Sequence, residues 1–372
     1  MIETLSNSTE NVASTQVTPQ STTSTFAPDH TGKAAIVTGS NSGIGLECAR
    51  QLLDRGLSKL ILAVRDEGKG AIASQDLASG RDLEPDTIEV WHLDYSSYDS
   101  ITSFANRAKS LENLDIVVLN AGVYRLPRVI LPTGHEEDIQ VNYLSTALLT
   151  ILLLPILEAK RRPKADPGRL TVVSSSVAAW SRLKPPQDGG PLLTSLDDAA
   201  GAKAFDHHQQ YCTSKLLGQL FLTQLTQRVP SSVAVINYVH PGLCYGSSLA
   251  RDGAGTILGF IASVVFRIFG RSCGGGARAI VDAAVSHGEE VHGQYLDGGI
   301  PAKYVFRPFR ECTSCTSNIL GDRMASVVYT AEGEQMARTL WQETMSELSF
   351  AGVEDVIKAL AVEMTTPSKA AE

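Results

Sequence analysis

Thr38-Gly39-Ser40-Asn41-Ser42-Gly43-Ile44-Gly45 is the stretch that decides the fold, because it joins the apolar run Ala34-Ala35-Ile36-Val37 to a helical pattern. Glycines at a strand-to-helix turn let the backbone bend tightly and approach a ligand. The first N–H groups of the helix and its positive end attract negative charge. A glycine pattern alone is a weak signal, but its place after a buried strand predicts that residues 39–45 bind the pyrophosphate of a dinucleotide.

The composition of the 372-residue chain is that of a large globular protein, with 43% hydrophobic and 19% charged residues. A net charge of -8 and the lack of a basic cluster longer than Lys160-Arg161-Arg162 argue against nucleic acid as a partner. Six scattered cysteines favour a reducing compartment, so we expect a cytoplasmic protein. Cys312-Thr-Ser-Cys315 is a lone CxxC, for which two ordinary thiols are favoured over a metal or redox site, and no metal is expected.

Three segments could resemble a targeting or membrane segment. Residues 1–31 are rich in Ser and Thr and lack a long apolar run and a basic start, which predicts a disordered lead-in rather than a signal peptide or an anchor. The apolar run 147–157 is too short to span a bilayer and predicts a buried core helix. Residues 256–270 are also short and contain Arg267, so a mobile substrate cover is favoured over a weak contact with a membrane surface.

Strand-like and helical patterns alternate along the chain. Apolar strands are expected at 59–64, 87–93, 114–119, 169–173 and 233–239, and helices at 43–55, 67–79, 97–110 and about 135–160. This alternation predicts an α/β fold with a doubly wound parallel sheet (a Rossmann fold) as a single catalytic domain over residues 32–306. Ligands of such sheets bind beyond the carboxyl ends of the strands, where Arg65, Asp94 and Asn120 fall.

Two long segments and a tail stand outside this alternation. Residues 181–209 form a polar, proline-rich insertion, which we expect to be irregular and to serve as a lid or binding loop. Residues 243–272 are apolar and punctuated by glycine, as suits a mobile cover over a hydrophobic substrate. After an expected helix at 274–286 and a short strand at 293–296, residues 307–372 form a C-terminal extension with helical stretches such as 332–348, to which no task can be assigned.

Arg65 follows the second expected strand, where a dinucleotide fold places the residue that recognises the adenosine ribose. An acidic residue there binds the ribose hydroxyls, whereas a cation accommodates a 2′-phosphate. Arg65 therefore favours NADP(H) over NAD(H). The alternative is a surface arginine paired with Asp66 or Glu67.

Taken in order, the glycine turn, Asn120-Ala121-Gly122, Asn142, Ser174-Ser175-Ser176 and Tyr211-x-x-x-Lys215 resemble the short-chain dehydrogenase/reductase family over roughly residues 33–300. The pair Arg65-Asp66 and the long insertion are most similar to retinol-dehydrogenase-like and fungal biosynthetic members. The resemblance implies a set of cofactor-binding residues. They are Gly39, Ser40, Asn41, Ser42, Gly43, Ile44, Gly45, Arg65, Asp94, Asn120, Ala121, Gly122, Tyr211, Lys215, Pro241 and Gly242.

Tyr211 and Lys215 lie four residues apart, and hence on one face of an expected helix. Reduction of a carbonyl leaves a developing alkoxide that needs a proton, and an ammonium near a phenol favours the phenolate, so Tyr211 can serve as the acid–base group. A serine hydroxyl can polarise the substrate oxygen. The resemblance selects Ser175 for this role, with Ser176 as second choice. It also implies that Lys215 reaches the nicotinamide ribose and that Asn142 holds a water linking Lys215 to solvent.

The turn His240-Pro241-Gly242 would bring the chain close to the nicotinamide. The family often places a threonine four residues after this glycine, but Gly246 stands there, and Ser247 is a candidate substitute. His207 and His208, just before the catalytic tyrosine, could contact substrate, although an exposed helix start is the simpler interpretation.

The sequence thus predicts an NADP(H)-dependent oxidoreductase that interconverts a ketone or aldehyde and an alcohol on a sizeable apolar molecule, in a biosynthetic (secondary metabolite) pathway. The alternative is a nucleotide-sensing or scaffold protein that has the fold without turnover. The presence of Asn142, Ser175, Tyr211 and Lys215 together disfavours it. The family commonly pairs subunits through the helices of Asn142 and Tyr211, which makes a homo-oligomer a further hypothesis.

Overall fold

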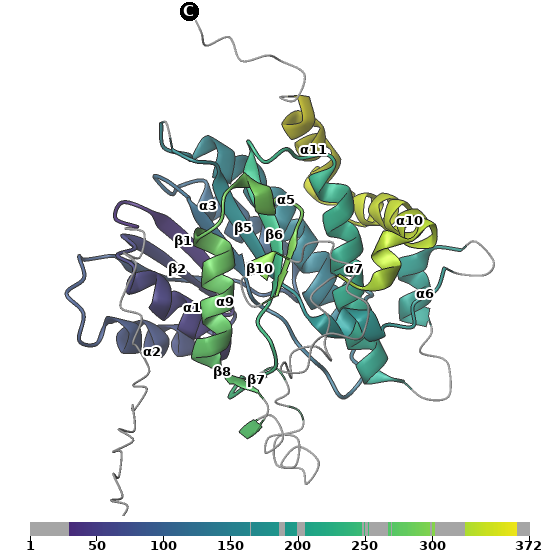
Figure 1. Ribbon diagram of the computed structural model, residues 1–372, viewed down its shortest axis with the longest axis horizontal. Helices are drawn as coiled ribbons and strands as arrows, with labels where there is room; N and C mark the ends of the chain where they lie inside the picture. Colours follow the sequence, from purple (N-terminus) through teal and green to yellow (C-terminus); the bar gives the residue numbers. More distant parts are fainter. Residues whose placement is uncertain are drawn as a thin grey trace, which may run out of the picture.

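A central sheet organises the computed structural model, which describes residues 30–163, 165–185, 190–198, 205–247, 249, 252, 267–268, 270–297, 300–301 and 324–362. Within these ranges the sheet has eight strands, which lie in the order β10-β9-β6-β5-β4-β1-β2-β3 (Figure 1). They are β1 (Ala34–Thr38), β2 (Lys59–Val64), β3 (Ile88–His92), β4 (Ile116–Leu119), β5 (Gly168–Val173), β6 (Ala234–His240), β9 (Tyr295–Asp297) and β10 (Ile300–Pro301). All neighbours pair in parallel except β9 and β10. The strand order reverses between β1 and β4, which is where such sheets bind their ligands.

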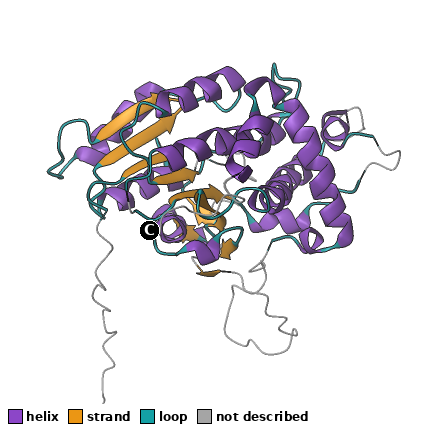
Figure 2. Ribbon diagram, turned by 90° about the horizontal axis from the view of Figure 1, so that it is seen from above, coloured by secondary structure: helices purple, strands orange, loops and turns teal. Residues whose placement is uncertain are grey.

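Helices cover both faces of the sheet, and the strands lie between them in Figure 2. One face packs on α1 (Gly43–Leu53), α2 (Glu67–Ala78) and α9 (Cys273–Val285), and the other on α3 (Tyr98–Ala108), α5 (Ser145–Ala159) and α7 (His207–Thr226). Successive side chains of a strand point to opposite faces of the sheet. Ala35 and Val37 pack in the core with α1, α2 and α9, whereas Ile36 packs in the core with α3, α5 and α7. Strands buried on both faces read as continuous apolar runs, which is why the sequence located them. The predicted Rossmann fold is confirmed.

The long helix expected at about 135–160 is interrupted. It consists of α4 (Glu137–Ile139), a π-helical turn η1 (Gln140–Leu144) and α5, and Asn142 lies in the π turn. By length and composition the combined segment Glu137–Ala159 could span a membrane, but 89% of its most apolar window is buried inside the protein. The expectation of a core helix for 147–157 is confirmed.

The insertion at 181–209 is less irregular than expected. It contains α6 (Leu192–Asp198), and α7 already begins at His207 because the Asp206 side chain accepts a hydrogen bond from Gln209 N (3.1 Å) and caps the helix. Of the expected cover 243–272, the ends form a small parallel ladder of β7 (Cys244–Tyr245) and β8 (Arg271–Ser272). Most of its remaining residues, like residues 1–29 and the Cys312–Cys315 motif, lie outside the described residues.

The helical stretch expected at 332–348 is confirmed as α10 (Ala331–Glu347). The described part of the C-terminal extension adds the short helices η7 (Ser326–Tyr329) and η8 (Ser349–Ala351) and ends in α11 (Val353–Val362). Short 3-10 turns also occur as η2 (Ser176–Trp180) and η5 (Glu289–Val291). Trp341 of α10 stacks on Phe221 of α7 with ring centroids 5.4 Å apart, while α11 packs on α5. The extension therefore covers part of the helix surfaces through which subunit pairing was expected, and the homo-oligomer stays a prediction.

Candidate active site

The turn between β1 and α1 can only be built with glycine at its critical positions. Gly39 and Gly43 adopt φ values of +63° and +57°, in the left-handed region that L side chains rarely enter. A Cβ on Gly45 would overlap the carbonyl oxygen of Gly39 and the side-chain nitrogen of Asn120. The turn thus brings bare backbone to the N-terminus of α1. This arrangement fits a pyrophosphate, as the sequence predicted.

Thr38 joins the glycine turn to the end of β4, a role that was not predicted from the sequence. Its Oγ1 accepts hydrogen bonds from the backbone N–H groups of Asn120 and Ala121, both at 3.0 Å. The Asn120 amide donates in return to the Thr38 carbonyl oxygen (3.0 Å). The predicted residues 120–122 therefore lie directly beside the glycine turn, at the point where the strand order reverses.

Arg65 stands exposed at the end of β2. Within the described ranges it forms no ion pair, since its neighbour Asp66 caps α2 by accepting from Lys69 N (3.0 Å) and also pairs with the Lys69 ammonium (3.4 Å). The hydrogen bond from Lys69 N is the main reason why the pKa of Asp66 is lowered. Asp94 lies beyond β3, where its Oδ1 accepts from the backbone and hydroxyl of Ser96. The Arg65 guanidinium therefore remains available to a ligand at this sheet edge.

Tyr211, Lys215 and Ser175 are brought together although they come from two separate elements. Tyr211 and Lys215 occupy one face of α7 and are both buried, with the Lys215 ammonium 5.8 Å from the centre of the Tyr211 ring. Ser175 follows β5, and a side-chain hydrogen bond joins it to the Tyr211 phenol. The Lys215 ammonium donates to the carbonyl oxygen of Val173 (3.3 Å). Three of the four predicted catalytic side chains thus share one small region.

Asn142, the fourth, holds the adjoining loop. Its Oδ1 accepts from Val123 N (2.8 Å), and its Nδ2 donates to Val123 O (2.8 Å) and to Ser214 Oγ (3.0 Å). A Cβ on Gly122 would stand 3.0 Å from Asn142 Oδ1 and 3.6 Å from the Lys215 nitrogen, so a larger residue there would crowd both. Both polar atoms of the amide thus have protein partners. Asn142 also lies in the π turn, a frequent feature of helices at functional sites.

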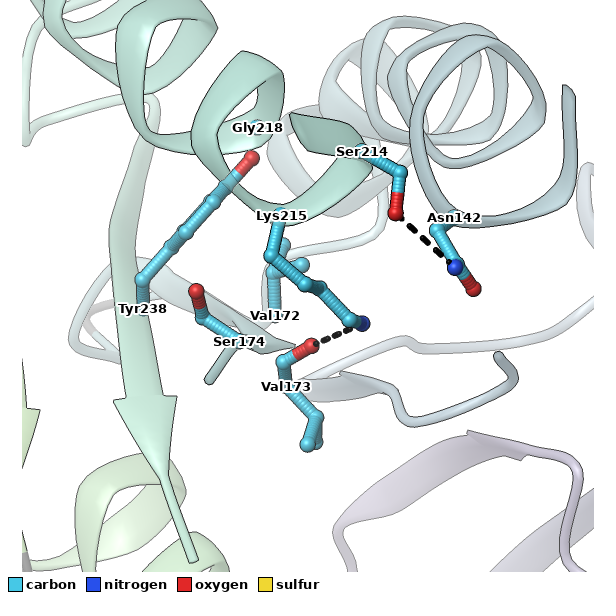
Figure 3. A pocket seen from close by; sticks show the side chains of 8 residues that line it. All are labelled: Asn142, Val172, Val173, Ser174, Ser214, Lys215, Gly218 and Tyr238. Carbon is cyan, nitrogen blue, oxygen red and sulfur yellow. Dashed lines mark hydrogen bonds between the residues drawn. The ribbon is translucent and has the colours of Figure 1, made fainter. Parts of the chain in front are cut away.

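A small cavity of about 10 Å³ lies behind Lys215 (Figure 3). This volume is at the lower limit for one water molecule. Its lining is Asn142, Val172, Val173, Ser174, Ser214, Lys215, Gly218 and Tyr238. The buried hydroxyl of Ser174 has no hydrogen-bond partner among the described residues, so one water there would satisfy it. The water that the resemblance places between Asn142 and Lys215 remains a prediction, and this cavity is where it fits.

Burial opposes the charged form of both members of the predicted catalytic pair, Tyr211 and Lys215. It raises the pKa of Tyr211, with a further increase from Asp138, while the hydrogen bond to Ser175 lowers it. Burial also lowers the pKa of Lys215 to about 8, against the opposing effect of Asp138. The hydrogen bond to Ser175 therefore offsets part of the effect of burial on the phenol. The contribution of the Lys215 ammonium to the phenolate stays a prediction.

Asp138 and Tyr124 are neighbours of the catalytic pair that sequence reasoning missed. Asp138 is 0% exposed, and one of its oxygens accepts from Arg125 N (3.2 Å) while the other has no hydrogen-bond partner in the described part of the chain. Burial, and then the charge of Glu136, raise its pKa to about 8. The Tyr124 ring meets that of Tyr211 edge-on at 5.0 Å. The acidic run 136–138 could have been a signal, but acidic residues at a helix start are normally exposed.

The chain after β6 explains why the usual threonine is missing. Gly242 and Gly246 adopt φ values of +83° and +80°, so a threonine at 246 would be strained. Ser247 is half-buried, whereas Ser248 lies outside the described residues. The expected helix start at His207 and His208 is confirmed, but both are half-buried rather than exposed, and the His207 ring lies 5.7 Å from that of Tyr124.

Comparison with known proteins shows to which family the chain belongs. A family profile described as short chain dehydrogenase matches residues 33–183. The short-chain dehydrogenase fogG of Aspergillus ruber is 44% identical over 335 residues, which cover 89% of each chain. The chain belongs to the short-chain dehydrogenase/reductase family. This short-chain dehydrogenase is also 41% identical over 331 residues to the short chain dehydrogenase/reductase mfmJ of Annulohypoxylon moriforme, with 88% of each chain covered.

Solved structures share the fold of this short-chain dehydrogenase at low sequence identity. An uncharacterized protein from Mycobacterium Paratuberculosis has a TM-score of 0.57 at 24% identity, covering 87% of this chain and 96% of the other. A 3-oxoacyl (acyl-carrier-protein) reductase from Agrobacterium tumefaciens C58, solved with NADP bound, has a TM-score of 0.52 at 22% identity, covering 73% and 95%. The protein is thus an oxidoreductase of a family that binds nicotinamide cofactors.

Proposed function

We propose that this short-chain dehydrogenase is an NADP(H)-dependent enzyme that interconverts a ketone or aldehyde and an alcohol on a sizeable apolar molecule, in a biosynthetic pathway for secondary metabolites. The observation that carries the proposal is the contact of the Tyr211 phenol with Ser175, beside the buried ammonium of Lys215 and next to the glycine turn. A protein that only senses nucleotides would have no need of this arrangement.

Two hydroxyl groups that bond to one another can together bind a single substrate oxygen. In the reducing direction, Tyr211 would donate its proton to the oxygen that becomes the alcohol, and in the oxidising direction it would take that proton. Ser175 would hold the same oxygen and stabilise its developing charge. Lys215 would return a proton to Tyr211 from solvent, by way of a water in the cavity behind it. A bound nicotinamide supplies or accepts the hydride.

The cofactor would be held by residues 39–45, Asp94, residues 120–122, Pro241 and Gly242, with Tyr211 and Lys215 at its nicotinamide end. Arg65 supports NADP(H), because it is exposed at the strand end and forms no ion pair with a described residue. The Agrobacterium reductase with NADP bound adds support from a protein of the same fold.

The proposal of an apolar substrate is supported by two apolar side chains, one a few residues after Ser175 and one directly after Gly242. Trp180 and Leu243 remain 47% and 37% exposed. Large exposed apolar side chains beside a site suit an apolar ligand. The biosynthetic role is inferred from the fungal short-chain dehydrogenases fogG and mfmJ, which match this chain nearly over its whole length.

The decisive experiment is the substitution Tyr211→Phe, assayed by NADPH oxidation against a panel of apolar ketones. Loss of the proton donor should lower turnover by about 10³-fold, while NADPH binding, followed by cofactor fluorescence, stays unchanged. Tyr329→Phe, at a half-exposed tyrosine in the C-terminal extension, is the matched control and should keep full activity. Wild-type protein that binds NADPH but reduces no ketone or aldehyde and oxidises no alcohol would instead favour the nucleotide sensor.

A further inference from the structure

Helix α10 of the C-terminal extension binds the first turn of α6. Both carboxylate oxygens of Glu343 accept backbone N–H groups, one from Leu192 and one from Leu193, each at 2.7 Å. α6 belongs to the insertion between Ser175 and Tyr211, whereas Glu343 lies about 150 residues further along the chain. The two helices lie side by side at one edge of the molecule (Figure 1). A charged acceptor for two N–H groups makes this a strong attachment.

The other end of α6 is attached through His135. Its Nδ1 lies 2.7 Å from Oδ2 of Asp197 in α6, and its Nε2 lies 3.2 Å from Oε1 of Glu347 in α10. The second carboxylate oxygen of Asp197 accepts from Glu136 N (3.0 Å), and the Tyr98 hydroxyl donates to Glu347 (3.4 Å). One imidazole therefore bridges the insertion, the C-terminal extension and the start of the helix that carries Asn142.

The helix α6 depends on these attachments because it is short. It has seven residues, far below the length at which an isolated helix is stable in water. Leu192 and Leu193 are buried in the hydrophobic core that contains α3, α5 and α7. Met336 and Leu340 of α10 belong to the same core. Its position therefore depends on the burial of its two leucines and on the attachments to α10 and His135.

The beginning of the insertion is fixed separately, next to the catalytic residues. The Ser181 hydroxyl bonds to that of Thr213 (2.9 Å), and the Gln209 side chain accepts from Arg182 N (2.9 Å) and donates to Trp180 O (3.1 Å). These contacts attach the residues after Ser175 to the first turns of α7, where Tyr211 lies. The insertion is therefore held at its start by α7 and in its middle by α10.

We propose that α10 is a positioning element of the substrate site, in which Glu343 and Glu347 hold α6 and so set how the insertion borders Ser175 and Tyr211. The extension contacts α3, η1, α5, α6 and α7, which carry neither the glycine turn nor Arg65. Its effect is therefore expected on substrate binding rather than on the part of the cofactor that those residues would hold. This inference rests on the proposed function, since the substrate effect is measured as a change in KM.

The test compares Glu343→Ala with Glu334→Ala, a variant on the same helix whose carboxylate pairs with the exposed Arg338. Loss of two charge-assisted hydrogen bonds should speed amide hydrogen exchange at 192–193. It should also raise KM for an apolar ketone by about tenfold, with kcat and the Kd for NADPH unchanged. Glu334→Ala should leave all four quantities at wild-type values. Glu343→Gln keeps one acceptor oxygen and the side-chain shape, so its exchange rate and its KM should lie between those of wild type and Glu343→Ala. It provides a second test if the alanine variant does not fold.

Unchanged exchange at 192–193 in Glu343→Ala would overturn the inference whatever the activity of the enzyme. So would faster exchange with an unchanged KM, or an equal loss of NADPH affinity in the variant. Wild-type protein that turns over no carbonyl substrate would be a failure of the proposed function, and the exchange measurement separates that result from a failure of the positioning role.

Discussion

The region proposed to bind the nucleotide and the region proposed to bind the substrate are positioned by different interactions. Around β1, β2 and β4, the proposed cofactor cradle is made of backbone, glycine conformations and one threonine hydroxyl, all within a few residues of strand ends. Around α6 and α7, positions are set by ionisable side chains from remote parts of the chain, such as His135, Glu343 and Glu347. The first region is specified locally. The second is specified by contacts between distant parts of the chain.

The largest effect that this contrast predicts comes from Gly45→Ala. The added Cβ would meet the Gly39 carbonyl, which is backbone and cannot rotate away, so the turn must open. Overpacking of this kind costs about 1–3 kcal/mol, and NADPH binding should weaken by about 100-fold. Titration of cofactor fluorescence measures it. Gly275→Ala is the control, because its nearest neighbour, Arg271 Cβ, would stand 3.5 Å away. If Gly45→Ala bound NADPH with wild-type affinity, the glycine turn would not be part of the cofactor site.

Arg65→Ala should act on the same region with a smaller and more selective effect. Without the guanidinium, a 2′-phosphate loses a charge-assisted hydrogen bond, so KM for NADPH should rise by about tenfold while KM for NADH stays unchanged. Lys69→Ala, which removes an exposed cation that already pairs with Asp66, should change neither value. Equal effects of Arg65→Ala on both cofactors would contradict the NADP(H) preference.

The smallest effect concerns the region proposed to bind the substrate and depends on pH. Burial lowers the pKa of His135, but hydrogen bonds to Asp197 and Glu347 outweigh it and raise the pKa from its ordinary value of 6.5 to about 9. A raised pKa means that the charged histidine stabilises the fold fully below pH 6.5, and that this contribution disappears as the pH rises through about 9. The hydrogen bond to His135 also lowers the pKa of Glu347 from its ordinary value of 4.5. The contribution of this carboxylate to folding stability is therefore fully present above pH 4.5.

His135→Gln should therefore lower the Tm by on the order of 2 °C at pH 6, with a difference from wild type that shrinks towards pH 9.5. Thermal unfolding followed by circular dichroism between pH 5.5 and 10 measures this. His287→Gln, at a histidine bonded to Asp282 on the far side of the sheet, is a suitable comparison. A Tm difference that is constant over this range would show that the His135 charge does not hold α6.

The parts of the fold that could be predicted are those with local signals. Strands buried on both faces appear as apolar runs, so β1, β2, β4, β5 and β6 were located to within about two residues. Asp66 and Ser97 cap α2 and α3 with their side chains, which matches the predicted helix starts. α6 was missed because its seven residues are too few to show a helical period. Asp138 was missed because burial of an acidic run depends on what packs over it.

By itself, the sequence determined the alternation of strands and helices, the glycine turn and the spacing of Tyr211 and Lys215, since each depends on residues within one or two turns of each other. Tertiary structure alone decided that Ser175 meets Tyr211, that Asp138 is buried beside them, and that Glu343 reaches α6. The physical reason is that backbone conformation is governed by near neighbours, whereas the burial and pairing of a charge depend on elements that come together only when the chain has folded.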